Sequence, residues 1–131
     1  MSITGFNHFN LRARRQLLDD LRQFYVAVVG LTPGARPPLK SFGYWLYAGN
    51  QAILHLSEAA PNEERSTNVV STMDHVAFAC TDMVAALARL QQHNVPYRTG
   101  EVPVSGERQL FFRDPAGNGV ELNCPRTPDA M

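Results

Sequence analysis

Four residues whose side chains can bind a metal ion occur as two matched pairs along the chain. His8 and His55 form the first pair, and His75 and Glu121 follow them by 67 and 66 positions. Imidazole nitrogens and carboxylate oxygens are common metal ligands in proteins. The near-constant spacing predicts a duplicated unit in which both copies contribute to one shared metal site.

The residues around these pairs repeat as well. The segment Gly5-Phe6-Asn7-His8-Phe9-Asn10-Leu11 is echoed by Thr72-Met73-Asp74-His75-Val76-Ala77-Phe78, and Ala48-Gly49-Asn50 is echoed by Ala116-Gly117-Asn118. Each half of a 131-residue chain is too small to bury a full core alone, so we expect the halves to fold together as one domain over residues 1–131. The expected organisation is module one at 5–57, a polar linker at 58–72 and module two at 73–124.

Charge and composition narrow the kinds of partner. The net charge is zero and the Lys and Arg residues are scattered, which argues against nucleic acid and against an acidic membrane surface. The first residues lack a basic and then apolar leader, and no apolar run approaches the ~20 residues that span a bilayer. We therefore expect a soluble, cytoplasmic protein that binds a small molecule. Two cysteines, Cys80 and Cys124, are expected to be reduced core residues.

Hydrophobic periodicity predicts the same order of elements in both modules. In module one, residues 5–12 alternate like a strand, and residues 14–29 place Leu17, Leu18, Leu21, Phe24, Tyr25 and Val28 at helical spacing before Gly30. Pro33, Gly34, Pro37 and Pro38 indicate an irregular passage. Strands are expected at 42–47 and 52–56, joined by a Gly49-Asn50 hairpin.

Module two repeats this order. A strand is expected at 73–80, then a helix at 83–93 with Thr81 or Asp82 as its N-cap and with Val84, Leu87 and Leu90 facing inward. His93 falls at the end of this helix. Further strands are expected at 97–102, 109–113 and 119–123. Both modules therefore have the order β-α-β-β-β, and the fold class is α+β with mixed strand directions.

Strand alternation sorts the residues of module two by face. If His75 points to one face of the sheet, Ala77 and Ala79 point to that face as well. If Glu121 also points to it, so does Asn123. The two cysteines point the other way. Small and polar residues then surround the candidate ligands, as a ligand-filled cleft requires.

The ordered set His8, His55, His75 and Glu121 on paired β-α-β-β-β modules resembles the vicinal oxygen chelate superfamily, which includes glyoxalase I, extradiol dioxygenases and bleomycin-binding proteins. Further marks are Phe24-Tyr25 followed by Val29-Gly30-Leu31, and Phe112-Arg113-Asp114-Pro115-Ala116-Gly117-Asn118 followed by Val120-Glu121-Leu122. The resemblance covers residues 5–124. It implies two tandem modules that form one domain, with a curved mixed sheet around a metal cleft and commonly a homodimer.

By this resemblance, His8, His75 and Glu121 are the metal ligands. His55 occupies a fourth position, either as another ligand or as an acid/base or supporting group. Such a set suits a divalent ion such as Fe, Mn, Ni, Co or Zn and leaves positions open for a substrate with two adjacent oxygens. Candidate pocket residues are Asn10, Trp45, Tyr47, Phe111 and Asn123.

Three functions remain in play. We favour a metal-dependent enzyme with glyoxalase-like lyase or isomerase chemistry on a small oxygen-bearing substrate. An extradiol-type dioxygenase with His55 as its base is one alternative. A non-catalytic drug-binding protein like those that confer bleomycin resistance is the other, and it has no need for four convergent ligands.

Overall fold

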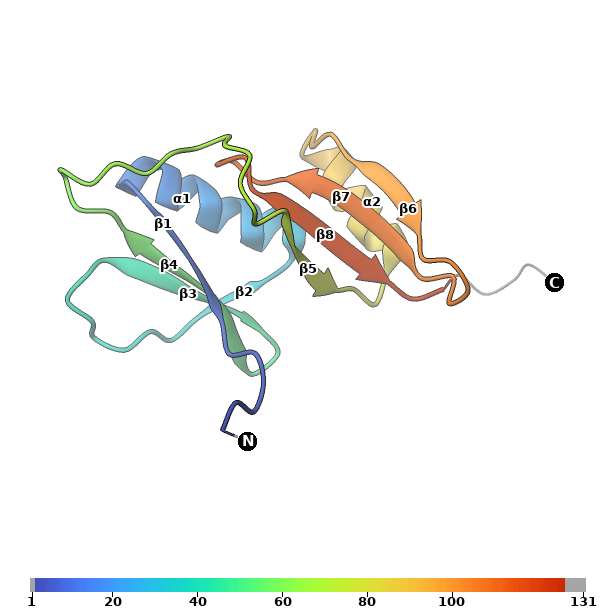
Figure 1. Cartoon of the computed structure of the whole chain (residues 1–131), viewed down its shortest axis with the longest axis horizontal. Coiled ribbons are helices and arrows are strands. Elements are labelled where there is room, and N and C mark those ends of the chain that lie inside the picture. Colours follow the sequence, from blue (N-terminus) through green and yellow to red (C-terminus); the bar gives the residue numbers. More distant parts are fainter. Residues whose placement is uncertain (1, 127–131) are drawn as a thin grey trace. The chain divides into compact units, whose positions relative to one another are not determined.

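The chain divides into two compact units, with the boundary between Ser66 and Thr67. This computed structural model describes residues 2–126. Each unit carries its own four-stranded sheet and its own helix (Figure 1). The unit boundary falls inside the predicted linker at 58–72.

The first unit contains four strands and one helical segment. These are β1 (Phe9–Ala13), α1 (Arg15–Phe24), its continuation as a π-helix η1 (Tyr25–Val29), β2 (Thr32–Gly34), β3 (Gly43–Ala48) and β4 (Gln51–Glu58). The strand order in the sheet is β1-β4-β3-β2. Strand β1 pairs with β4 in parallel, and the other two pairings are antiparallel.

The second unit repeats this topology. Its elements are β5 (His75–Ala79), α2 (Met83–Gln92), β6 (Arg98–Glu101), β7 (Arg108–Arg113) and β8 (Gly119–Cys124), with the sheet order β5-β8-β7-β6. Strand β5 pairs with β8 in parallel. The predicted α+β class and the repeated β-α-β-β-β order are confirmed. The strands form two four-stranded mixed sheets.

The first helical segment shows where sequence patterns were incomplete. The helix predicted at 14–29 is present, but its last turn widens into η1, and Gly30 then ends it with φ 98°, a left-handed conformation that favours glycine. The strand β2 lies in the passage predicted to be irregular. Proline lacks the N–H that a central strand needs, but Pro33 is tolerated because β2 is an edge strand.

The second helix begins after Asp82, one of the two predicted N-caps, but one residue that was predicted to face inward does not. The Asp82 side chain accepts a hydrogen bond from the backbone N–H of Ala85 at 3.1 Å. Val84 was predicted to face inward and is 77% exposed, whereas Ala86 and Leu90 are fully buried. The inward stripe follows positions 83, 86, 87 and 90, so Val84 lies one position away from it.

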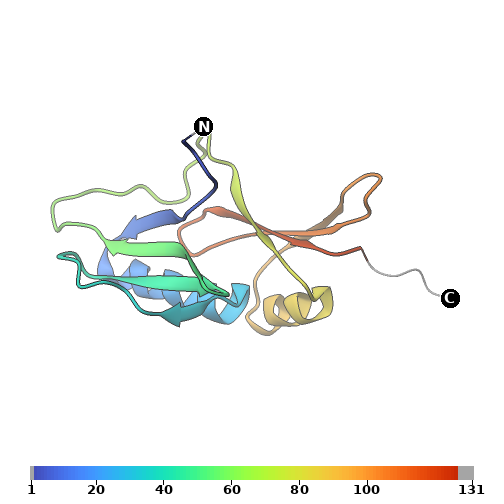
Figure 2. The ribbon, with the colours of Figure 1, turned by 90° about the horizontal axis from the view of Figure 1, so that it is seen from below.

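In each unit the core lies between the helix and one face of the sheet (Figure 2). The buried side chains of the first unit include Leu18, Leu21 and Tyr25 from the helical segment and Leu46, Leu54 and Leu56 from the strands. Those of the second include Ala86, Leu90, Leu110, Phe112, Val120, Leu122 and Cys124. Because strand side chains alternate, the neighbouring positions are left for the opposite face. Within residues 2–126, no helix has the length and apolar character needed to cross a membrane.

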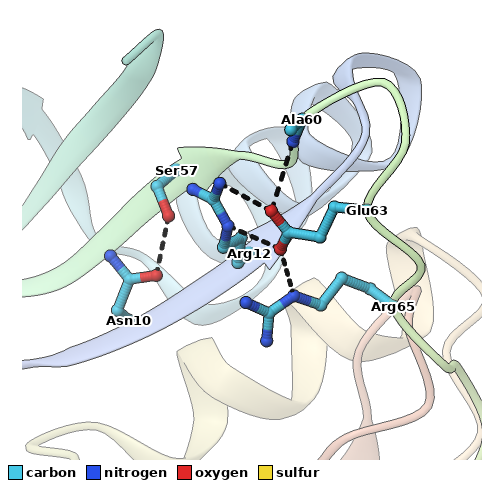
Figure 3. A network of polar contacts seen from close by, with 6 residues as sticks. All are labelled: Asn10, Arg12, Ser57, Ala60, Glu63 and Arg65. Carbon is cyan, nitrogen blue, oxygen red and sulfur yellow. Dashed lines mark hydrogen bonds and ion pairs between the residues drawn. The ribbon is translucent and has the colours of Figure 1, made fainter. Parts of the chain in front are cut away.

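A polar network ties the segment after β4 to β1 (Figure 3). Arg12 donates two hydrogen bonds to the Glu63 carboxylate, at 2.7 and 2.8 Å, and Arg65 donates a third at 2.5 Å. The backbone N–H of Ala60 adds a contact of 3.3 Å. These bonds, first that from Arg12 and then that from Arg65, lower the pKa of Glu63 to about 2.

We predict that Glu63→Gln destabilises the protein at neutral pH, because the substitution removes the charge that both guanidinium groups contact. A carboxylate with a lowered pKa in the folded state stabilises that state above its ordinary pKa of 4.5. The stabilisation is lost as the pH falls from there toward about 2. Urea unfolding at pH 7, 4.5 and 3 should show the difference between wild type and variant shrinking as the pH falls.

The matched control is Glu64→Gln, the same chemical change at the exposed neighbouring position. It should leave the urea midpoint unchanged. A difference for Glu63→Gln that stays constant down to pH 3 would show that the carboxylate charge is not the cause.

The predicted single domain can be tested with one core leucine from each unit. Leu54 and Leu110 are both fully buried. Replacing either with alanine should lower the free energy of unfolding by about 2–5 kcal/mol. If each half is too small to be stable alone, both variants should show one unfolding transition in calorimetry. A second transition confined to one variant would mean that the units unfold independently.

Candidate metal centre

The first unit places His8, Asn10, Trp45 and His55 together. In the register of the sheet, Asn10 on β1 and Trp45 on β3 both lie opposite His55 on β4. His8 directly precedes β1, two residues before Asn10 and therefore on the same face by alternation. Parallel pairing of β1 with β4 thus brings together two histidines separated by 47 positions in the sequence.

Three rings form one stack on this face. The His8 and His55 rings lie 3.7 Å apart at an interplanar angle of 14°, and the Trp45 and His55 rings lie 4.0 Å apart at 10°. An imidazole nitrogen offers its lone pair in the plane of its ring. Two rings stacked face to face therefore cannot both direct a lone pair at one ion. His55 must turn away from His8 before both can act as ligands.

His55 is the more sheltered of the two histidines. Burial lowers its pKa, the positive charge that His8 can carry lowers it further, and a hydrogen bond to the backbone of Ala52 opposes both effects. The neutral imidazole is the form that binds a metal ion or accepts a proton. His55 is thus suited to either role predicted for it.

The hydrogen bonds of the Asn7-His8 segment fix the free nitrogen of His8. The side-chain oxygen of Asn7 lies 2.7 Å from His8 Nδ1, and the Gln51 side chain holds the segment by donating to the backbone oxygen of Asn7 at 2.8 Å. An amide oxygen only accepts, so Nδ1 of His8 carries the proton. In the neutral ring, Nε2 is then the nitrogen with a lone pair to offer.

The second unit brings His75 and Glu121 into direct contact. His75 begins β5, and Glu121 lies on the adjacent strand β8, opposite Ala77. Nε2 of His75 is 3.2 Å from Oε1 of Glu121, whose side chain is only 8% exposed. Gln109 and Asn123 approach the other carboxylate oxygen at 3.4 and 3.5 Å, near the outer limit of hydrogen bonding.

His75 repeats the hydrogen-bond arrangement of His8. Its Nδ1 lies 2.8 Å from a carboxylate oxygen of Asp74, the residue before it, so Nδ1 again carries the proton. In a neutral ring Nε2 then has the lone pair, and it lies 3.2 Å from Oε1 of Glu121. Two lone pairs at this distance repel unless a cation or a proton lies between them. A metal ion with bonds of about 2.1 Å holds neighbouring ligand atoms about 3.0–3.4 Å apart, so the pair fits a divalent ion.

Each unit therefore supplies one pair of candidate ligands. Within residues 2–126, no three His, Cys, Asp or Glu side chains are gathered in an arrangement that could hold an ion. The four-residue site stays a prediction. In both units, however, the histidine that begins the pattern has its Nδ1 bound to the preceding side chain and its Nε2 available. This is the support that metal-binding histidines usually receive.

The remaining predicted site residues lie on the same faces. Phe111 faces His75 edge-on at 6.2 Å, and Asn10 accepts a hydrogen bond from Ser57. Tyr47 donates to the backbone oxygen of Ala35, and its ring lies close to Gly34 on β2. Of the two cysteines predicted to be core residues, Cys124 is fully buried but Cys80, which follows the end of β5, is only half-buried.

Asn7, Asp74 and Gln51 support the site and were not among the residues predicted from the sequence. A signal was present for two of them, because Asn7 and Asp74 occupy the same position before the repeated histidines. Both side chains carry an oxygen that can accept from Nδ1. No sequence pattern indicated Gln51, whose role depends on where β4 begins.

Comparison with known proteins places the chain in a family. A family model described as the Glyoxalase/Bleomycin resistance protein/Dioxygenase superfamily matches residues 5–122. The uncharacterized protein YaeR of Escherichia coli (strain K12) is 32% identical over 106 residues, which are 77% of this chain and 82% of YaeR.

Solved structures agree on the fold. A glyoxylase/bleomycin resistance protein/dioxygenase domain from Frankia sp. EAN1pec matches with a TM-score of 0.73 and 20% identity, covering 95% of this chain and 100% of that one. Lactoylglutathione lyase from Agrobacterium tumefaciens matches with a TM-score of 0.65 and 24% identity, covering 95% and 96%. The chain belongs to the glyoxalase, bleomycin resistance protein and dioxygenase superfamily, as its resemblance to the vicinal oxygen chelate proteins indicated.

Proposed function

We propose that this protein is a divalent-metal-dependent enzyme with glyoxalase-like lyase or isomerase chemistry on a small oxygen-bearing substrate. The contact between His75 Nε2 and Glu121 Oε1 carries this proposal, because a buried carboxylate and an available imidazole nitrogen 3.2 Å apart suit a cation. Nδ1 of His75 already bonds to Asp74. His8, with the same arrangement, is the third proposed ligand.

Each residue of the site has a proposed role. His8, His75 and Glu121 would hold Fe, Mn, Ni, Co or Zn, in one chain or across a homodimer. When bound, such an ion supplies Lewis acidity toward two adjacent oxygens of a substrate. His55 would hold or move a proton of the substrate, or turn to become a fourth ligand. Trp45 and Phe111 would form walls that exclude water beside the ligands.

An extradiol-type dioxygenase is the second candidate. Two histidines and one carboxylate are the set that non-haem Fe(II) oxygenases use, and the lowered pKa of His55 suits a base. Metal analysis of the purified protein, with oxygen-uptake assays on catechols and turnover assays on thiol adducts of 2-oxoaldehydes, separates the candidates. A protein that retains none of the five ions in equilibrium dialysis would leave only the drug-binding alternative.

We predict that His75→Gln and His55→Gln behave differently. His75→Gln should abolish metal retention, because it removes one of three ligands that are near the minimum for tight binding. His55→Gln should retain the ion. If His55 is an acid/base group, turnover should fall by about 10²- to 10⁴-fold at full metal content, and if it is a fourth ligand, metal affinity should fall as well. Metal stoichiometry, measured side by side, decides. Equal and complete loss of metal in both variants contradicts this division of roles.

The supporting role of Asp74 gives a further prediction. Asp74→Ala should lower metal affinity by about 10- to 100-fold, because it removes the hydrogen bond that orients the His75 ring. Asp74→Asn should cost less, because it recreates the Asn7-His8 arrangement of the first unit and retains an accepting oxygen. Competition with a fluorescent chelator measures both affinities. An unchanged affinity in Asp74→Ala would show that Asp74 does not support a ligand.

A further inference from the structure

A pocket of about 450 Å³ lies on the second unit beside the candidate ligand His75. Its lining includes Asp74, His75, Tyr97, Arg98, Phe111 and Arg113. The two arginines have no part in the proposed metal site. Their positions indicate what kind of molecule the pocket receives.

The register of the sheet places both arginines on the face of His75 and Glu121. Arg98 on β6 pairs with Phe111 on β7, and Phe111 pairs with Glu121 on β8. In the next row, Arg113 on β7 pairs with Gly119, which in turn pairs with His75. Gly119 has no side chain, so no side chain on β8 separates Arg113 from His75 in this row.

Phe111 forms the floor between the metal ligand and one arginine. Its ring lies 6.2 Å from that of His75, and the guanidinium carbon of Arg98 lies 4.1 Å above its centroid. Stacking on an aromatic ring fixes the plane of a guanidinium while its N–H groups at the edge stay available. Arg98 is thus oriented before a ligand arrives.

Arg113 is also held by one bond that uses part of its donors. Its Nη1 donates to the backbone oxygen of Gly117 at 3.0 Å. Within residues 2–126, neither Arg98 nor Arg113 lies within 4.0 Å of a carboxylate oxygen as an ion pair. Two guanidinium groups without a carboxylate partner therefore line one pocket.

The charge inside the pocket favours an anion near its arginines. Asp74 is the acidic residue in the lining, and its carboxylate is already hydrogen-bonded to His75. Arg98, Arg113 and the His75 ring all line this pocket.

We propose that this pocket binds the acidic group, a carboxylate or a phosphate, of a small substrate through Arg98 and Arg113. This substrate class rests on the proposed function, in which neighbouring oxygens of the same molecule reach the metal ligands. The planar fork of arginine matches carboxylate and phosphate oxygens with paired hydrogen bonds. Phe111 would contact the carbon skeleton between the two ends.

The test uses metal-free protein and three aromatic probes: phenylphosphonate, phenylacetate and the neutral phenylacetamide. Titrations followed by the amide NMR signals of Phe111 and Gly119 give the dissociation constants. Both anions should bind, and phenylacetamide should bind at least about 10-fold more weakly, because hydrogen bonds between charged groups are the stronger ones. Equal binding of the amide and the anions would overturn the proposal.

Substitutions then assign the anion to the arginines. Arg98→Met and Arg113→Met should each weaken phenylphosphonate binding by about 10-fold or more. Arg108→Met is the matched control, because Arg108 lies on the same strand as Arg113 but alternates to the opposite face. It should leave binding unchanged. An equal loss in Arg108→Met would mean that general charge attracts the probe and would overturn the pocket.

Metal binding is measured separately, so that the two proposals can fail separately. His8→Gln, which removes a proposed metal ligand that is not part of the pocket lining, should still bind phenylphosphonate. Anion binding in a protein that retains no metal would support the anion pocket and contradict the proposal that the protein is a metal-dependent enzyme. Metal retention in a protein whose Phe111 and Gly119 signals do not respond to either anion would overturn the pocket alone.

Discussion

The candidate site depends on the parallel pairing of the first strand with the last strand in each unit. Strand β1 pairs with β4 and places Asn10 opposite His55, while β5 pairs with β8 and places Ala77 opposite Glu121. Side chains alternate along a strand, so a slip of one residue in β8 would turn Glu121 toward the helix. The fully or almost fully buried Val120 and Leu122 prevent this slip, because each would then be exposed. The apolar core therefore sets the position of the ligands.

Among the features of the candidate site, the burial of the Glu121 carboxylate most clearly reduces the stability of the fold. A carboxylate loses hydration when it is buried and requires strong partners in exchange. Glu121 has two long contacts from the amides of Gln109 and Asn123 and one from His75. Arg12 and Arg65 give the more exposed Glu63 much shorter bonds. A weakly compensated carboxylate inside the second sheet is expected where a cation completes the set, and it is hard to explain by stability alone.

Much of the fold was predictable from local patterns, because periodicity and end signals are properties of short segments. The helical stripe from Leu18 to Val28, the Gly30 terminus and the Asp82 cap all follow from residues close in sequence. The strand β2 was missed because its pairing with β3, and not its own residues, makes it a strand. The ring stack of His8, His55 and Trp45 depends on side-chain rotamers and on cross-strand register, neither of which a sequence specifies.

The two units have kept one hydrogen-bond pattern while their surroundings have diverged. A histidine with Nδ1 bound to the preceding side chain opens both, but the partner is the neutral Asn7 in the first and the charged Asp74 in the second. Around His55 the first unit offers stacked rings and amides, and around His75 the second offers a carboxylate and two arginines. A carboxylate partner makes an imidazole a stronger donor to a cation than an amide does. The second unit is therefore the stronger half of the proposed metal site, and the first is better suited to exclude water and to move a proton.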